Sequence, residues 1–154
     1  MIATDTNLLV HAHRADSEWH QRANSCIVDL AEGHASWGIP WPCVHEFLAI
    51  VTHPRIWNPA SSMAQALDQI DAWLESPVAF VLSESESHWT LLKQLLARGK
   101  VHGPVVHDAR IAALCLGHGV TELWTADRDF NRFPSLATRN PLVEKLPAGR
   151  KPPR

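Results

Sequence analysis

Two short apolar runs that end in acidic residues restrict the folds open to this chain. One is Ile2–Asp5, with the sequence IATD, and the other is Leu123–Phe130, with the sequence LWTADRDF. A short apolar run is typical of a buried strand, and acids just past it stand at the carboxyl end, where open α/β sheets bind their ligands. The sequence therefore predicts two strand ends that share one acidic pocket.

Strand-like and helix-like segments alternate along the rest of the chain. The strand before the second acidic run is expected within 120–125, and further strands within 35–39, 78–82 and 131–142. The continuous apolar run 78–82 is typical of a strand covered on both faces. Apolar residues at helical spacing fill the intervals between the strands. This alternation predicts a three-layer α/β/α fold around a central, mainly parallel sheet of four to five strands.

Local signals mark several element ends. Asp16 and Ser17 are candidate N-caps for a helix that ends at Gly33. Two further helix starts show the capping-box pattern, at Ser62 with Gln65 and at Ser83 with Glu86. The chain of 154 residues fits one domain, which we expect to span 1–146, followed by a disordered basic and Pro-rich tail over 147–154.

Composition narrows the function classes. The net charge is -2, whereas proteins that bind nucleic acid through bulk charge alone are basic, so any such binding needs local cations or a metal. The three cysteines, Cys26, Cys43 and Cys115, form no Cys-x-x-Cys pair, which favours a reduced, cytoplasmic protein over a disulfide framework. No apolar run approaches the ~20 residues of a membrane span, and the first strand begins too early for a signal peptide.

Four acids from different segments are the candidate site: Asp5, Glu46, Asp108 and Asp127, with Asp129 behind them. Glu46 lies at the edge of an apolar helix stripe, which predicts a carboxylate half-drawn into the interior. Carboxylates held close together repel unless a cation shares the site, and hard oxygen ligands favour Mg²⁺ or Mn²⁺. Such a site can activate water and orient an attack on a phosphoryl group.

These residues resemble a known family. The matching stretches are Asp5-Thr6-Asn7, Glu46, His107–Ala113 and Thr125–Phe130. Taken in this order they look like PIN-domain ribonucleases, in particular the VapC toxins of bacterial toxin–antitoxin pairs. The resemblance runs from Met1 to about Leu142, and no acid of the family's set is missing.

The resemblance implies a PIN-like fold and a Mg²⁺- or Mn²⁺-dependent endoribonuclease toxin that a cognate antitoxin inhibits. The family's catalytic acids map onto Asp5, Glu46, Asp108 and Asp127. Asp5, Asp108 and Asp127 would bind the metal, Glu46 would bind it directly or through water, and Asp129 would assist from an outer shell. A homodimer is expected, and transfer RNA fits the family as a substrate, although nothing in these residues selects it.

Secondary contacts to RNA are assigned to residues beside the acids: Asn7, Thr125, His107, Arg128 and Arg132. Each has a plainer interpretation. Asn7 and Thr125 could bond only the local backbone, and His107 could be a solvated surface residue. Arg128 and Arg132, like Arg110, could grip phosphates or pair with neighbouring acids.

The acids have plainer interpretations too, as helix caps, turn caps or surface residues: Asp108 could be an N-cap, Asp129 could cap a turn, and Glu46 could be solvated.

The tryptophans divide into two groups. Trp19, Trp73 and Trp89 fall on predicted core stripes, whereas Trp41 and Trp57 lie in Pro-rich segments and could face a partner or a second copy. The histidines lack zinc-ligand spacing.

Two other functions compete with the nuclease. A non-catalytic module could bind metal or RNA through the same acids in a regulatory complex, although an intact acid set argues against it. A receiver-type signalling domain also gathers acids at strand ends, but it pairs adjacent acids after its first strand, and here Asp5 stands alone.

Overall fold

The computed structural model describes residues 1–143, so the expected tail over 147–154 lies outside the described part. The strands are β1 Ile2–Thr4, β2 Trp37–Pro40, β3 Ala79–Leu82, β4 Glu122–Trp124 and β5 Thr138–Arg139. The helices are α1 Thr6–His13, α2 His20–Glu32, α3 Trp41–Val51, α4 Met63–Leu74, α5 His88–Arg98 and α6 Val105–Gly117, and a 3-10 helix, η1, spans Arg128–Arg132.

The strands form one parallel sheet in the order β3-β2-β1-β4-β5. The chain moves outward from β1 through β2 to β3 and then returns to the other side of β1 with β4. The sheet therefore changes winding direction between β1 and β4, and at such a switch point the loops diverge and leave a crevice. The two strands that the sequence marks with trailing acids are the two that flank this crevice.

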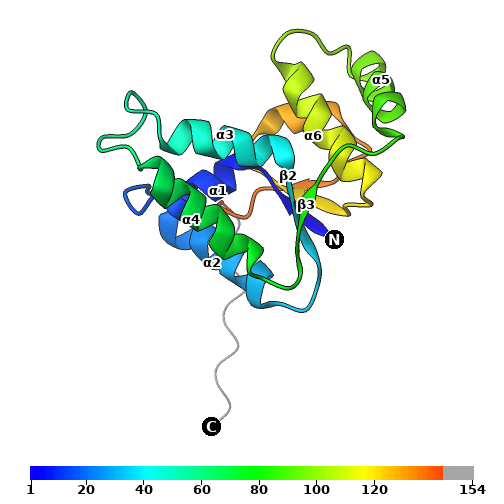
Figure 1. Ribbon diagram of the computed structural model, residues 1–154. Coiled ribbons are helices and arrows are strands. Elements are labelled where there is room, and N and C mark those ends of the chain that lie inside the picture. The colour runs from blue at the N-terminus through cyan, green and yellow to red at the C-terminus, as the bar shows by residue number, and fades with distance from the viewer. Residues whose placement is uncertain (144–154) are drawn as a thin grey trace.

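Helices cover both faces of the sheet, which confirms the three-layer arrangement. Figure 1 shows α1, α2 and α4 together on one side and α5 and α6 on the other. The α3 helix begins directly after β2, with Pro40 as its N-cap residue and Pro42 in its first turn. Proline suits this position because the first-turn N–H groups have no partner inside the helix. The short connection fixes where Glu46 can lie.

The sequence-based expectation for β3 was wrong in one respect. Residues 79–82 form a strand, but β3 lies at the edge of the sheet, and Phe80 is 50% exposed. A continuous apolar run does not distinguish an edge strand from a central one, since both can be rich in β-formers.

Only one of the helix N-caps expected from the sequence forms in the structure. The Ser62–Gln65 capping box forms at the start of α4, with both reciprocal bonds present. Ser83 and Glu86 form none, because α5 begins later, after Ser87. Asp16 and Ser17 also fail as caps of α2, whose N-cap residue is Trp19. Asp16 instead pairs with Arg14.

The core is continuous across the sheet, and tryptophans contribute unequally to it. Trp73 is 6% exposed, as expected, but Trp89 is 61% exposed, so its assignment to the core was wrong. The Trp89 ring lies on the outer face of α5, under the Lys93 ammonium group at 5.5 Å from the ring centroid. All three cysteines are buried free thiols, which agrees with the expected lack of a disulfide framework. Within the described residues, no helix combines the length and apolar character that a membrane crossing requires.

Candidate metal centre

Asp5 is the buried centre of the site. Its backbone N–H donates to the Trp124 carbonyl at 3.0 Å, which continues the pairing of β1 with β4. Its side chain is the N-cap of α1 and accepts a bond from the Thr6 amide at 2.8 Å. Only 5% of the residue is exposed, so the fold itself determines where this carboxylate lies.

Three more donors hold the Asp5 carboxylate. Thr125 Oγ1 and Asn7 Nδ2 donate to Oδ2, each at 2.7 Å, and the buried Cys43 thiol donates to Oδ1 at 3.6 Å. Burial raises the pKa of Asp5, and the Glu46 charge adds to this, although the bonds from Thr125 and Thr6 oppose it. The carboxylate is therefore ordered but electrostatically costly in the absence of a cation.

Asn7 and Thr125 do more than bond the local backbone. Asn7 Nδ2 also lies 3.2 Å from Thr125 Oγ1, and Asn7 Oδ1 accepts from the Ala126 amide at 3.0 Å. Thr125 Oγ1 accepts in turn from the Asp127 amide at 3.0 Å. These contacts join the segment after β1 to the segment after β4. Asn7 and Thr125 therefore fix the position of the Asp5 carboxylate relative to Asp127.

Glu46 reaches the site by a contact that the sequence did not indicate. Its Oε2 accepts a hydrogen bond from Thr6 Oγ1 at 2.6 Å. Contrary to expectation, Glu46 is exposed rather than half-buried. The Thr6 hydroxyl, and not the apolar stripe, therefore orients this carboxylate toward β1.

Asp108, Asp127 and Asp129 form the tightest group of acids. Each offers a carboxylate oxygen, and these oxygens all lie within 4.8 Å of one another. Asp127 is the N-cap of η1, with its Oδ1 accepting from the Asp129 amide at 2.8 Å, so the turn cap is Asp127 rather than Asp129. Asp108 lies in the first turn of α6, where Pro104 is the N-cap residue, so Asp108 is not needed as a cap.

The electrostatics tie these acids to Asp5 and Glu46. The pKa of Asp108 is raised to about 6, first by burial and then by the charges of Asp127, Asp5, Asp129 and Glu46. The other four carboxylates therefore lie near enough to Asp108 to raise its pKa, and Glu46 and Asp129 line the same cleft as Asp108. The donor set is hard oxygen only, and the mutual repulsion is what a divalent cation relieves, so these residues fit Mg²⁺ or Mn²⁺.

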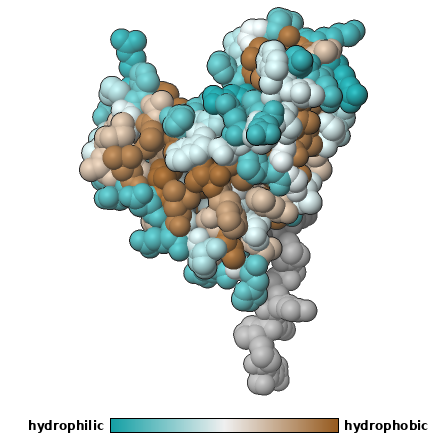
Figure 2. Space-filling model, turned by 45° about the vertical axis from the view of Figure 1, so that its right-hand side comes forward, coloured by the Kyte–Doolittle hydropathy of each residue, from teal (hydrophilic) through white to brown (hydrophobic). Residues whose placement is uncertain are grey.

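A cleft of about 580 Å³ opens over the acids, between α3 and α6. Its lining includes Pro42, His45, Glu46, Pro104, Val105, His107, Asp108, Arg110, Ile111 and Asp129. Figure 2 shows the molecule hollowed between the two groups of helices, with mainly hydrophilic and neutral surface along the hollow. His107, which is exposed, is one of the lining residues, as expected for a residue that could contact a substrate.

The cationic candidates are placed differently. Arg110 lines the cleft, but its Nε and Nη2 both donate to Glu84 Oε1, at 3.0 and 2.7 Å, so the ion-pair interpretation holds for it. Arg128 and Arg132 are exposed on η1, and neither has an ion pair among residues 1–143. Their guanidinium groups are available to solvent beside the acids.

Sequence reasoning missed Thr6, Cys43 and His45. Thr6 stands inside the Asp5-Thr6-Asn7 motif, but nothing in its residue type indicates a partner 40 positions away. Cys43 and Glu46 are three positions apart on α3, so helical spacing could have placed both on the face toward Asp5.

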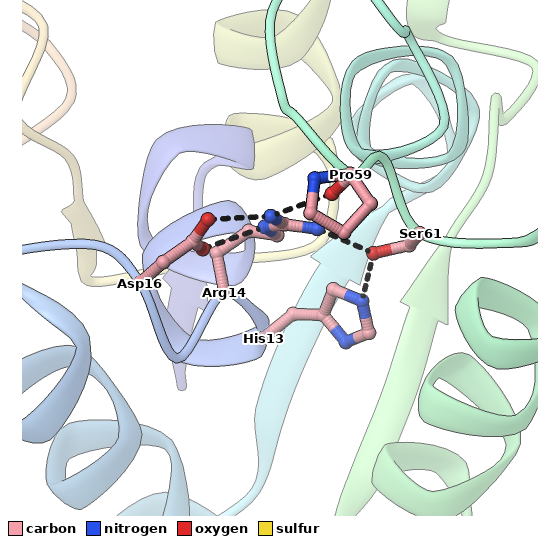
Figure 3. Close-up of polar contacts among 5 residues, drawn as sticks. All are labelled: His13, Arg14, Asp16, Pro59 and Ser61. Atoms are coloured by element: carbon pink, nitrogen blue, oxygen red, sulfur yellow. Dashed lines mark hydrogen bonds and ion pairs between the residues drawn. The ribbon is translucent and has the colours of Figure 1, made fainter.

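A larger hollow, about 700 Å³, lies beside the end of α1 and away from the acids. Figure 3 shows its polar wall, where the Arg14 guanidinium donates to Asp16 at 2.9 and 2.6 Å, to Ser61 at 3.1 Å and to the Pro59 carbonyl at 3.0 Å. The Trp57 ring covers the guanidinium at 4.5 Å. The Arg14 guanidinium therefore bonds groups of the protein itself and links the loop before α4 to α1. We do not assign it to ligand binding.

Replacing Arg14 by alanine is expected to destabilise the fold by about 1–3 kcal/mol, because the Pro59 carbonyl and Ser61 lose a charged donor and Trp57 loses its packing. The urea midpoint, followed by circular dichroism, measures this. The matched variant Asp16→Asn removes the exposed partner only and should have the smaller effect. Equal midpoints for Arg14→Ala and the parent protein would contradict a structural role.

The chain matches the model of the PIN domain over residues 2–136. It is 35% identical over 142 residues to VapC ribonuclease Mb2897 of Mycobacterium bovis, covering 92% of this chain and 96% of that one. Ribonuclease VapC48 of Mycobacterium tuberculosis is 28% identical and covers 90% and 95%. Among solved structures, FitAcB from Neisseria gonorrhoeae has a TM-score of 0.65 at 20% identity, covering 94% of this chain and 100% of that one.

Proposed function

We propose, on the premise that this chain belongs to the PIN-domain family, that it is a divalent-metal-dependent endoribonuclease toxin of the VapC kind. The observation that carries the proposal is that acids from four parts of the fold gather at one cleft: Glu46, Asp108 and Asp129 line it, and the charges of Asp5 and Asp127 also raise the pKa of Asp108. The names of its relatives, VapC ribonucleases over nine-tenths of its length, support RNA as the substrate class.

In this proposal Asp5, Asp108 and Asp127 hold Mg²⁺ or Mn²⁺, and Glu46 completes the set directly or through water. Asp129 would assist this set, since one of its carboxylate oxygens lies within 4.8 Å of those of Asp108 and Asp127. The cation would polarise the scissile phosphoryl group and favour ionisation of the attacking water. The protein's own contribution is to fix the acids: Asn7 and Thr125 hold Asp5, and Thr6 holds Glu46.

Substrate contacts follow from the placement of charge. Arg128 and Arg132 are exposed on η1, next to Asp127 and Asp129, and would pair with phosphates flanking the scissile one. His107 would contact RNA from α6, where it lines the cleft. Because the net charge of the whole chain is -2, these local cations and the metal must supply the electrostatic attraction.

A cognate antitoxin is the proposed protein partner. Solved structures with this fold include VapBC2 from Rickettsia felis bound to a DNA fragment from its promoter, at a TM-score of 0.64. A reading frame directly upstream of this gene that encodes a small DNA-binding protein would support the pairing. Co-purification of the two products would test it.

Metal dependence has a direct test. Purified protein incubated with structured RNA should cleave it in Mn²⁺ or Mg²⁺ and not in EDTA. Without RNA, Mn²⁺ should raise Tm by several degrees, since a ligand at 100 times its Kd stabilises the folded state by about 2.7 kcal/mol. Asp108→Asn should abolish most of both effects. Undiminished cleavage in EDTA would refute the proposal, and a Tm increase without cleavage would indicate the non-catalytic alternative.

A further inference from the structure

The acidic cleft does not end at the acids. A second hollow of about 370 Å³ adjoins it and shares Pro42, His45 and Arg110 as lining residues. The far wall of this hollow includes Trp41 and Ser83. One groove therefore leads from the carboxylates, past Arg110, to an aromatic side chain.

Trp41 lines this groove and is exposed there to solvent. The residue is 41% exposed, although it is the first residue of α3 and its neighbours Pro40 and Cys43 are buried. The His45 ring, one helical turn on, stacks against it with centroids 5.8 Å apart and planes 25° from parallel. His45 therefore helps to fix the orientation of the indole and leaves the rest of its surface to solvent.

We propose that Trp41, held by His45, stacks on a base of single-stranded RNA beside the scissile phosphate, which makes it a substrate-binding residue. This rests on the ribonuclease function proposed above. Single-stranded RNA is recognised largely by stacking of unpaired bases on aromatic side chains. Trp41 and Glu46 are five positions apart on one helix, about 7.5 Å along its axis and about 140° around it. They line two adjoining hollows, so a chain that follows the groove from the acids reaches the indole.

The lining between the acids and Trp41 offers both polar and apolar contacts, as a nucleotide requires. His45, Arg110, Glu84 and Ser83 are charged or polar, and Pro42 and Leu114 are apolar. The Arg110 side chain is 41% exposed and faces a single carboxylate, Glu84. A groove that runs from the proposed metal-binding acids, past the Arg110–Glu84 ion pair, to an aromatic ring follows the order of phosphate and base in a nucleotide chain. Stacking also suits an acidic protein, because it does not depend on net charge.

The test uses a short single-stranded RNA and the full chain carrying Asp108→Asn, so that cleavage does not interfere with binding. In this background Trp41→Ala should weaken binding on the order of 10-fold, as measured by fluorescence anisotropy, and Trp41→Phe should restore most of it. The control is Trp89→Ala, which removes a more exposed indole outside the groove and should leave binding unchanged. The loss caused by Trp41→Ala should persist at high salt.

A second measurement identifies the contact. RNA with an abasic residue next to the cleavage site should bind the Trp41 protein and Trp41→Ala about equally. Equal binding of intact RNA by Trp41 and Trp41→Ala proteins of native circular dichroism would overturn the proposal. A dimer-to-monomer change in sedimentation of Trp41→Ala, with RNA binding intact, would overturn it too and assign the ring to a contact between copies. If the parent chain fails to cleave RNA in Mn²⁺, the ribonuclease function fails, whatever the binding assay shows.

Discussion

Asp108→Asn is expected to lower RNA cleavage at least about 100-fold and, in metal-free buffer, to raise the stability of the protein. Changes to groups that only orient metal ligands typically cost 10–100-fold, and Asp108 is placed as a ligand itself. The stabilisation follows from its pKa, which burial and four neighbouring carboxylates raise to about 6. Asparagine removes the charge that causes this repulsion and keeps the side-chain shape.

The pH dependence has a definite sign. The folded protein binds the Asp108 proton more tightly than the unfolded chain, whose ordinary value is 3.8. The parent therefore gains stability as pH falls from 7 through 6 toward 4, and it loses that contribution as pH rises through about 6. Solvent screens a partly buried carboxyl, so we expect about 1 kcal/mol, or about 3 °C in Tm.

Thermal unfolding in EDTA at pH 7 and pH 5 measures this effect. Asp108→Asn should unfold at higher temperature than the parent at pH 7, and the difference should shrink at pH 5. Asp71→Asn, an exposed acid on α4, is the matched control and should show neither change. A lower Tm for Asp108→Asn at pH 7 would mean that the acids do not repel one another as described.

Asp5→Ala should abolish cleavage as well, but it should lower stability rather than raise it. The Asp5 carboxylate caps α1 and accepts bonds from Thr125, Asn7 and Cys43 in a buried position. Alanine leaves those donors without an acceptor, at about 1–3 kcal/mol, and removes the cap, at about 1 kcal/mol. These losses exceed the relief of its repulsion from Glu46.

Urea unfolding of the metal-free proteins separates the two acids. Asp5→Ala should have a lower midpoint than the parent, and Asp5→Asn, which keeps an acceptor oxygen, should fall between them. Full cleavage by Asp5→Ala in Mg²⁺ would refute its place in the site. Opposite stability changes would distinguish the two acids. Asp5 is stabilised by hydrogen bonds from the fold, whereas Asp108 is mainly repelled by neighbouring carboxylates.

The sequence by itself determined the class of fold and predicted the members of the proposed site. Alternating strand and helix patterns imply a parallel sheet, and parallel strands with crossover helices follow few topologies. Acids placed just after Ile2–Thr4 and Leu123–Trp124 had to lie at the same carboxyl edge, because parallel strands share that edge. The ordered resemblance then added Glu46 and Asp108, which no strand pattern indicates.

Only the tertiary structure decided how each acid is held. Strand order put β1 beside β4, and this contact brings Asn7, Thr125 and the Asp5 carboxylate together across about 120 positions of sequence. The Thr6 bond to Glu46 and the Trp41 side of the groove depend on where α3 packs, and the residue types do not encode that. The edge position of β3 and the exposure of Trp89 have the same cause: apolar patterns report which residues can be buried, while the packing of elements far apart in the chain decides which are.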